Sequence, residues 1–484
     1  MNETRRLVVV GNGMAATRLV QELRRRSGTR EWSMTVVGDE RQNAYNRVLL
    51  SNVLSGATPI DALRLTPVDI DDVDIRLGVT VTSIDRARQL VVTSAGVIPY
   101  DVLVLATGST AVVPPITGLV TPEGGLRPGA AVFRTLDDCK RIIALAEHAR
   151  TAIVLGGGLL GLEAARGLAG RGLVVDLVHN APHLMERQLD STAGNVLSRT
   201  IRGLGVRVHT NATTLAMTGT DAITGVQLDD GRALDADLVV IACGVRPNVA
   251  LARECGLVVE RGIVVDDTLR TSDGDIYAIG ECAQHEGEVY GLVAPAWEQA
   301  TVLAELLSDA SAPIRYTGSR LVTRLKAAGV ELAAMGDVSP ANSDCDDDTE
   351  VLQFVDAARG TYKKVVVRHG RVSGAILLGD VSTVGTVTQL FDRSALAPHD
   401  RLALLFDGGR SAEAQTPARI PDRATICRCN GVTKGAITEC WFDGARSTDD
   451  VATRTRATTG CGTCRDTVDG IIDWLAASAA AEKC

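Results

Sequence analysis

Leu7-Val-Val-Val-Gly-Asn-Gly-Met-Ala-Ala16 is the stretch that decides the fold. Its four apolar residues predict a buried parallel strand, and the pattern Gly11-x-Gly13-x-x-Ala16 turns the chain tightly into a helix. Bare N–H groups at such a helix start form a seat for a pyrophosphate. A glycine-rich turn also occurs for packing reasons alone, so one copy indicates a dinucleotide site only weakly.

A second copy of the same pattern follows further along the chain, in Ile153-Val-Leu-Gly-Gly-Gly-Leu-Leu-Gly-Leu-Glu163. It repeats the apolar strand, the turn with spaced glycines and the start of a helix. Repetition strengthens the interpretation of both copies, because a turn made only for packing has no reason to recur in the same form. Two dinucleotide seats in one chain indicate two dinucleotides that must meet.

Length, charge and composition exclude several classes of protein. The 484 residues allow about three domains, each with its own core. A net charge of −9, the lack of a basic block and only 3% aromatic residues argue against binding to nucleic acid or to a membrane surface. Arg5-Arg6 precedes four apolar residues, fewer than the ~7–15 of a signal peptide core. We therefore expect a cytoplasmic protein.

Two other stretches of the first half bring polar or small groups toward a ligand. The strand Met34-Thr-Val-Val is followed by Asp39 and Glu40, where a carboxylate holds ribose hydroxyls unless the turn is merely solvated. Arg47 precedes a short helix and either pairs with a diphosphate or stays at the surface. Asp101-Val-Leu-Val-Leu-Ala-Thr-Gly-Ser109 predicts a buried strand whose small terminal residues let the backbone approach a ligand.

Eleven cysteines in a long chain without a signal favour metal or redox use over disulfides. Four are clustered as Cys427-x-Cys429 and Cys461-x-x-Cys464, in a final module of about 60 residues that is small enough to need a metal or cluster. Four thiolates bind either a [2Fe–2S] cluster or zinc, although C-x-C is unusual for structural zinc. Cys440 is expected to be a packing residue and Lys434 a surface charge.

Together these stretches resemble the two-dinucleotide flavin reductase superfamily with the disulfide-reductase-like fold. Within it, the chain is similar to the NAD(P)H-oxidising portion of assimilatory nitrite reductase large subunits and to the electron-transfer subunit of assimilatory nitrate reductase. The final module looks like the ferredoxin-like [2Fe–2S] domain of the bacterioferritin-associated type. The resemblance covers essentially the whole chain and rests on VVVGNGMAA, AYNRVLLS, VLATGS, GGGLLGLEAARGLAGRG, LMERQLD, GVRPN, TSDGDIYAIGEC, YGLVAP, ICRCNGVTKGAI and TGCGTC.

This resemblance implies an α/β fold with two Rossmann-like dinucleotide-binding domains, an α+β interface domain and a small helical [2Fe–2S] domain. A homodimer through the interface domain is expected by analogy. The expected limits are 1–112 with 246–311 for the FAD-binding domain, 113–245 for the NAD(P)-binding domain, 312–406 for the interface domain, 407–424 for a linker and 425–484 for the [2Fe–2S]-binding domain.

The resemblance also implies which residues hold each cofactor. For FAD they are Gly11, Gly13, Met14, Ala15, Ala16, Asp39, Arg47, Ala106, Thr107, Gly108, Gly280, Glu281, Val293, Ala294 and Pro295. For NAD(P)H they are Gly156, Gly158, Leu160, Gly161, Glu163 and His179, with Glu163 as the catalytic residue beside the nicotinamide and Gly244 as a further cofactor contact. The cluster ligands are Cys427, Cys429, Cys461 and Cys464.

The sequence leaves the nicotinamide donor open. An acid at the end of the second strand of a nicotinamide-binding domain favours NADH, and an arginine nearby favours NADPH. Here the strand Val174-Val-Asp-Leu-Val178 is followed by His179 and Asn180, so neither is present. NADH is favoured over NADPH, but both remain candidates.

The distribution of cysteines indicates how electrons leave the flavin. No cysteine occurs between Met1 and Phe133, which argues against disulfide or cysteine-sulfenate chemistry in that stretch. A cluster offers another exit, since hydride brings two electrons together and a cluster accepts them singly. No C-x5-C or C-x3-C pair marks a sirohaem and [4Fe–4S] site. We therefore expect a separate polypeptide as the acceptor, and the resemblance implies that it is a nitrate reductase catalytic subunit, with nitrite reductase as the alternative.

Two rival classes stay open. The first is a self-contained NAD(P)H oxidase or a ferredoxin/rubredoxin reductase, in which the final module is only regulatory. Removal of the chain from Asp407 onward would then leave turnover unchanged. The second is an iron-sensing or storage-release binding module, which would leave the two dinucleotide seats without a purpose.

Overall fold

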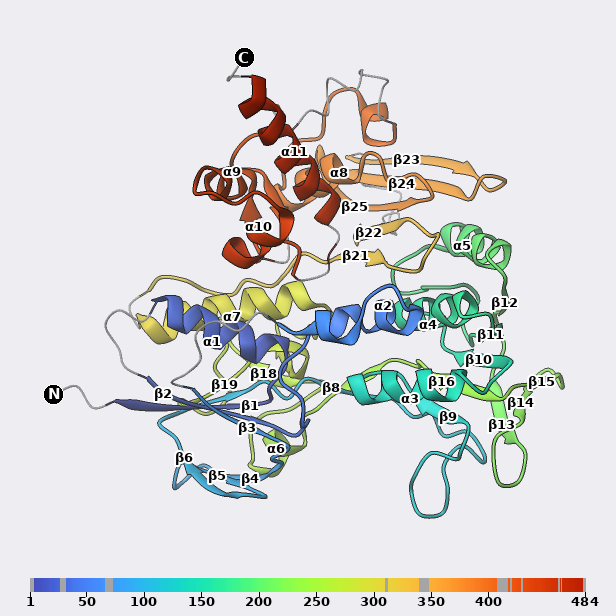
Figure 1. Ribbon diagram of the computed structural model, residues 1–484, viewed down its shortest axis with the longest axis horizontal. Helices are drawn as coiled ribbons and strands as arrows, with labels where there is room; N and C mark the ends of the chain where they lie inside the picture. The colour runs from blue at the N-terminus through green and yellow to red at the C-terminus, as the bar shows by residue number, and fades with distance from the viewer. Residues whose placement is uncertain are drawn as a thin grey trace.

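Figure 1 shows the protein as a computed structural model. The structure describes residues 4–26, 32–65, 73–309, 312–338, 348–406, 417, 420–427, 430–459, 462 and 464–481. In this part of the chain, no helix is both long and apolar enough to cross a membrane.

The first glycine-rich stretch builds a five-stranded parallel sheet with a helix packed on it. Leu7 to Val10 are at most 5% exposed, as expected for a strand that is covered on both faces. The strands in spatial order are β19 (Ile276–Ala278), β7 (Val102–Leu105), β1 (Arg5–Val10), β2 (Trp32–Gly38) and β3 (Val73–Leu77). Helices α1 (Met14–Arg26) and α7 (Val293–Ser308) lie together on one face of this sheet (Figure 1).

The second glycine-rich stretch builds the same arrangement again. Its sheet has the order β12 (Val206–His209), β11 (Val174–Val178), β10 (Thr151–Leu155), β16 (Leu238–Ile241) and β9 (Ala130–Val132), all parallel. Helices α3 (Leu136–Ala146), α4 (Leu159–Gly170) and α5 (Ser191–Gly203) accompany it. In both sheets the strand before the glycine turn is central, and the next strand along the chain lies beside it. The repetition in sequence is therefore a repetition of the fold.

Each parallel sheet also carries a three-stranded antiparallel insertion. In the first domain it is β4 (Val81–Asp85), β5 (Leu90–Thr93) and β6 (Gly96–Pro99); in the second it is β13 (Thr214–Thr218), β14 (Gly225–Leu228) and β15 (Ala233–Asp235). The shorter elements are η1 (Arg47–Leu49), α2 (Leu50–Ser55), η2 (Ile60–Leu63), α6 (Ala250–Glu254), β18 (Ile263–Val265), η3 (Gly280–Cys282) and β20 (Ala283–His285).

The chain crosses between the two domains twice, at neighbouring places. Strand β8 (Ser109–Ala111) leads away from the first sheet, and β17 (Val245–Pro247) returns to it. The two strands pair antiparallel, with Ala111 opposite Val245 and Ser109 opposite Pro247. This two-stranded connection fixes the end of one sheet close to the end of the other.

A mostly antiparallel domain follows. It has β21 (Val322–Leu325), β22 (Leu332–Gly336), β25 (Arg371–Leu378), β24 (Thr361–Arg368) and β23 (Thr349–Asp356) in this spatial order, with α8 (Val384–Arg393) and η4 (Arg401–Leu404). Tyr362 and Lys364 of β24 both donate hydrogen bonds to Asp190 at the start of α5, at 2.5 and 3.1 Å. These bonds attach the antiparallel domain to the second dinucleotide domain.

The C-terminal module is small and mainly helical. It contains β26 (Thr425–Cys427), β27 (Val432–Thr433), α9 (Lys434–Phe442), α10 (Thr448–Thr455) and α11 (Arg465–Ala481). The hydroxyls of Thr433 and Ser447 cap α9 and α10 by accepting hydrogen bonds from backbone N–H groups. The module lies over α1 and α7, on the side of the molecule away from the first sheet (Figure 1).

We retain the expected domain limits as our proposal, because the crossings at β8 and β17 lie close to residues 112 and 246. The proposed linker over 407–424 lies mostly outside the described residues, with only 417 and 420–424 described.

Candidate functional site

The first glycine-rich turn is shaped by a close approach of two backbone segments. Gly11 has φ +109°, and a Cβ atom there would lie 2.2 Å from the carbonyl oxygen of Ala106. A Cβ atom at Gly13 would meet nothing within 4 Å. Gly13 therefore leaves open space beside the first turn of α1, where an anion can reach the N–H groups. Ala16 is fully buried and packs inside the domain.

The second turn repeats this geometry closely. Gly156 has φ +112°, and its Cβ atom would lie 2.3 Å from the carbonyl oxygen of Ala242. Gly158, like Gly13, faces open space. Gly161 is more constrained than its counterpart Ala16, because its Cβ atom would lie 1.9 Å from the carbonyl oxygen of Gly156. Both turns thus have the close approach and the open seat that a pyrophosphate needs.

A cavity of about 1440 Å³ begins at the first turn and extends between the domains. It exceeds the roughly 300–1,000 Å³ of ordinary ligand pockets, so it has room for an extended cofactor together with a second ligand. Of the predicted residues, those that line it are Gly11, Gly13, Met14, Ala15, Asp39, Arg47, Ala106, Thr107, Gly108, Leu160, Glu163, Gly280, Glu281, Val293, Ala294, Pro295, Cys427 and Cys464.

Six of the predicted residues that the structure describes do not line this cavity. Ala16 lies behind the first turn, and Gly156, Gly158, Gly161 and His179 lie around the second turn. Gly244, with φ +94°, belongs to the crossing between the domains, where its carbonyl oxygen accepts a hydrogen bond from the N–H of Val112.

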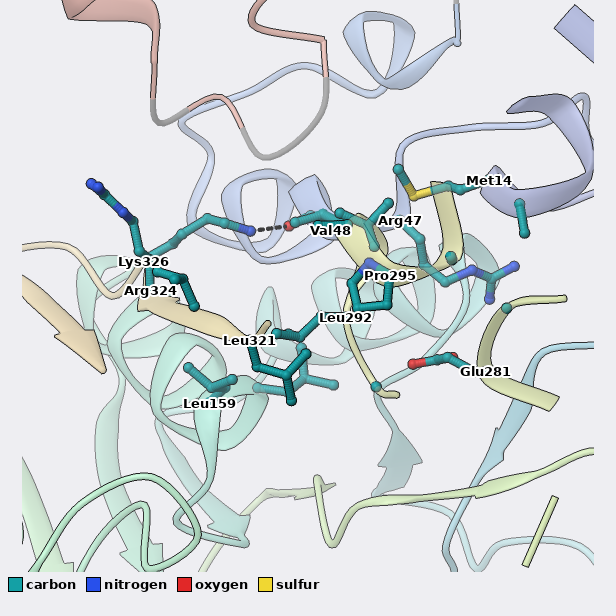
Figure 2. A pocket seen from close by; sticks show the side chains of 18 of the residues that line it. Met14, Arg47, Val48, Leu159, Glu281, Leu292, Pro295, Leu321, Arg324 and Lys326 are labelled. Carbon is teal, nitrogen blue, oxygen red and sulfur yellow. Dashed lines mark hydrogen bonds between the residues drawn. The ribbon is translucent and has the colours of Figure 1, made fainter. Parts of the chain in front are cut away.

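The apolar part of the cavity is formed where three domains meet. The N-terminus of α7 contributes Pro295, preceded by Leu292, while Leu159 comes from α4 and Leu321 from the segment before β21. Figure 2 shows the side chains of Leu159, Leu292 and Leu321 close together on one side of the cavity. Apolar walls at this place would shield a bound ligand from water.

Arg47 is held in the cavity by two neighbours. Its guanidinium pairs with Glu40 and lies over the Tyr45 ring, 5.1 Å from the centroid. Burial disfavours the charged form, but Tyr45 and Glu40 outweigh it and raise the pKa of Arg47. Glu40 is thus committed to Arg47, whereas Asp39 lines the cavity and makes no ion pair with any described residue. This arrangement supports Asp39 as the ribose-binding acid.

A second arginine, Arg134, was not predicted. It pairs with Glu281, and its Nη2 donates a hydrogen bond to Ser109 Oγ at 2.8 Å. Ser109 Oγ in turn donates to Glu281 at 2.7 Å. These three residues come from the crossing, the start of α3 and the end of the first sheet, so no local sequence pattern links them.

Glu163, the predicted catalytic residue, is 9% exposed and lines the cavity. Its Oε1 accepts a hydrogen bond from the backbone N–H of Lys326 at 3.2 Å. The Lys326 side chain lines the cavity, and its Nζ donates a hydrogen bond to the carbonyl oxygen of Val48 at 2.9 Å (Figure 2). The antiparallel domain therefore closes one side of the site, a role that the sequence did not reveal.

Around the second turn, His179 occupies the position where an acid usually holds the adenosine ribose. Its Nδ1 accepts a hydrogen bond from the N–H of Gly157 at 3.1 Å. The opposite ring nitrogen, Nε2, lies 2.9 Å from Glu186 Oε2. Because Nδ1 is an acceptor, the proton of the neutral ring is on Nε2 and points to Glu186. Glu186 was not predicted as a site residue.

Two of the four clustered cysteines, Cys427 and Cys464, face the cavity that begins at the first turn. Among the described residues, they are the cysteines that line it. Cys429 and Cys461 lie outside the described residues. A hydrogen bond with Cys464, opposed by burial and aided by the N–H groups of Asn430 and Thr458, lowers the pKa of Cys427. The thiolate form that is thereby favoured at Cys427 is the form in which cysteine ligates an iron–sulfur cluster.

The structure of the cysteine module confirms the expectation for Cys440 and corrects the one for Lys434. Cys440 is buried in the core of the module, as expected for packing. Lys434, however, is not a surface charge, since it is only 5% exposed. Its Nζ donates to the carbonyl oxygen of Ile420 at 2.9 Å and lies 5.1 Å from the centroid of the Trp474 ring. The start of α9 packs against the chain before β26, which covers a residue that the sequence placed in solvent.

Known families match along the chain in the same order as the structural units. The model of the pyridine nucleotide-disulphide oxidoreductases matches residues 5–300. The rubredoxin NAD+ reductase C-terminal domain matches 322–395, and the BFD-like [2Fe-2S] binding domain matches 425–474. The chain belongs to the pyridine nucleotide-disulphide oxidoreductase family. The predicted fold class and the predicted cofactors, FAD, NAD(P)H and a [2Fe–2S] cluster, are thereby confirmed.

Individual relatives show which members of this family the chain is similar to. The chain is 38% identical over 474 residues to the nitrite reductase [NAD(P)H] of Bacillus subtilis, covering 97% of this chain and 57% of the relative. It is 35% identical to the assimilatory nitrate reductase electron transfer subunit of the same organism, covering 97% and 60%. The chain thus spans less than two thirds of these relatives. The covalent putidaredoxin reductase–putidaredoxin complex shares the fold, with a TM-score of 0.74, 24% identity, and coverage of 84% of this chain and 97% of that chain.

Replacement of the two glycines of the first turn is expected to have different effects. Gly11→Ala forces a contact with the carbonyl of Ala106 at an unfavourable φ, so it should lower the thermal unfolding midpoint of the flavin-free protein. Gly13→Ala should leave that midpoint unchanged but weaken FAD binding about tenfold, by filling the open seat. Calorimetry and flavin titration measure the two effects. Equal loss of stability in both variants would contradict this assignment.

Proposed function

We propose that the chain oxidises NAD(P)H and transfers the electrons through FAD to a [2Fe–2S] cluster, and from there to a separate nitrate reductase catalytic subunit in nitrate assimilation. The reductase of assimilatory nitrite reduction is the alternative. One observation carries the proposal: a single cavity extends from the first glycine turn to Cys427 and Cys464. A path between the two kinds of redox site is what electron transfer within one chain requires.

Different residues of the chain bind the cofactors and exclude water from them. The open space at Gly13 binds the pyrophosphate of FAD, and the open space at Gly158 binds that of NAD(P)H. The Asp39 carboxylate accepts hydrogen bonds from the ribose hydroxyls of FAD. Leu159, Leu292 and Leu321 keep water away from the reacting rings, and Glu163 borders the same space. When bound, the cofactors supply transfer of a hydride as two electrons and their release one at a time. No acid–base group is needed for hydride transfer, so placement is the main contribution of the protein.

Support for the partner comes from the relatives. One is named a nitrite reductase and the other an electron transfer subunit of assimilatory nitrate reductase. The thiol content fits a cytoplasmic location, since the described cysteines are free rather than paired in disulfides. A homodimer through 312–406 is retained by analogy only. A ferredoxin or rubredoxin reductase remains the second candidate, because the antiparallel domain matches the rubredoxin NAD+ reductase C-terminal domain.

We also propose NADH as the preferred donor. His179 is at the strand end that selects between the two donors, and its ring is fixed by the N–H of Gly157. The contact between His179 Nε2 and Glu186 Oε2 therefore holds the Glu186 carboxylate beside this strand end, where the strand itself supplies no acid. The Glu186 side chain is 39% exposed, so a ligand can reach it. Its carboxylate oxygens can accept hydrogen bonds from ribose hydroxyls, and its negative charge repels the 2′-phosphate of NADPH.

Anaerobic titration of the purified protein with NADH is expected to bleach the flavin and to produce the electron paramagnetic resonance signal of a reduced [2Fe–2S] cluster. Cys427→Ser should keep flavin bleaching but lose or alter this signal, because a thiolate ligand is removed. Cys440→Ala, in the core of the same module, serves as the matched control and should keep the signal. Zinc in the module, or no metal, would contradict the proposal.

Purified nitrate reductase and nitrite reductase catalytic subunits distinguish the two acceptors. With NADH as the only reductant, nitrate consumption should depend on both the chain and the nitrate reductase subunit. Removal of residues 425–484 should abolish this delivery while NADH oxidation with ferricyanide continues. Turnover with rubredoxin that is unaffected by the truncation would favour the second candidate.

For the donor, Glu186→Gln is expected to lower the ratio of kcat/KM for NADH to that for NADPH about tenfold, since about 1.4 kcal/mol of discrimination is lost. Ferricyanide serves as the acceptor, and equilibrium binding of NAD+ and NADP+ should shift in the same direction. Arg187→Gln is the neighbouring control and should leave the ratio nearly unchanged. A wild-type preference for NADPH that disappears in Arg187→Gln would reverse the assignment.

A further inference from the structure

The cysteine module is attached to helix α1 by a set of polar contacts. Arg456 donates to Glu22 Oε1 and to Gln21 Oε1, each at 2.7 Å. Arg18 Nη1 donates to Asn430 Oδ1 at 3.0 Å. The cavity left between these residues is about 20 Å³, room for a single water molecule, so the two surfaces fit closely.

Buried charges make this contact specific. Glu22 is 3% exposed and Arg18 is 9% exposed. Burial opposes the charge of Glu22, but hydrogen bonds from Arg456 and Arg26 outweigh it and lower its pKa to about 2. Removing Arg456 would leave a buried carboxylate with fewer partners. Buried ion networks of this kind add orientation more than affinity, because desolvation offsets much of the attraction. The module is therefore held on α1 in one orientation.

Asn430 connects this contact to a predicted cluster ligand. Its Oδ1 is taken by Arg18, which leaves its Nδ2 group to donate on the other side. Nδ2 lies 3.6 Å from Cys427 Sγ, and the same group also donates to the carbonyl oxygen of Arg456 and to Thr459 Oγ1, the latter at 3.3 Å. Because a guanidinium only donates, Arg18 fixes which end of the amide points to the sulfur. The chain Arg18–Asn430–Cys427 thus runs from the flavin domain to the cysteine.

Hydrogen bonds to ligand sulfur atoms raise the reduction potential of an iron–sulfur cluster, since they stabilise the more negative reduced state. We propose that Asn430 is a positioning residue through which docking of the module on α1 raises the potential at Cys427. The docked module is then the better electron acceptor from the flavin domain. This inference rests on the proposed function, because the oxidation of NADH is the source of the electrons. The cluster takes up one electron in each reduction.

The decisive variant is Arg18→Gln, because it lies on α1 and leaves the module itself unchanged. In the full-length holoprotein, its cluster should show a tenfold smaller equilibrium constant for reduction, a fall of about 59 mV for one electron. Asn430→Ser should show a fall in the same direction. Electron paramagnetic resonance during a titration with dithionite and mediators measures both, and thermal unfolding with flavin content reports on folding.

Arg25→Gln is the matched control, because it removes the same charge from the same helix, next to Glu22. Its side chain is 63% exposed, and its cluster potential should stay at the wild-type value. An unchanged potential in a folded, flavin-loaded Arg18→Gln protein would overturn the inference, as would an equal fall in Arg25→Gln. A cluster that dithionite reduces but NADH does not would instead contradict the proposed function alone.

Discussion

The close approach of two backbone segments at each glycine turn is the constraint on which the rest of the structure depends. At Gly11 and at Gly156, a carbonyl oxygen from the neighbouring strand occupies the place of a side chain. This contact brings the end of β7 against the start of α1 and the end of β16 against the start of α4. Both helix N-termini are then open at Gly13 and Gly158. The same local geometry, used twice, produces two anion seats on either side of one crossing.

The crossing links the two dinucleotide domains through the antiparallel pair of β8 and β17. The cavity that begins at the first turn is lined from the second domain by Leu159, Leu160 and Glu163 of α4. The antiparallel domain and the N-terminus of α7 then close that space with apolar side chains and Lys326. A large, mostly apolar cavity between domains is where cofactor sites are found most often. The cysteine module completes its wall through Cys427 and Cys464.

Buried or half-buried charges recur at the contacts between units, and each has a nearby opposite charge. Glu22 is surrounded by Arg18, Arg26 and Arg456, and Glu281 is bound by Arg134. Such pairs contribute little net stability compared with apolar residues, but they penalise any other orientation of the units. The relative placement of the domains is therefore specified by charge, while their cores are held by apolar burial.

The sequence alone determined the features that depend on neighbouring residues. The two glycine turns, the duplicated strand–turn–helix unit and the cysteine spacing are local patterns, since a few consecutive residues set the backbone path and the ligand type. The tertiary structure decided what depends on residues far apart. Arg134 with Glu281, Glu163 with Lys326 and Arg18 with Asn430 follow no periodicity, and the last pair is 412 residues apart in the chain. Lys434 was misplaced because the chain before β26 and the Trp474 ring cover it, and such burial leaves no mark on the residues beside it.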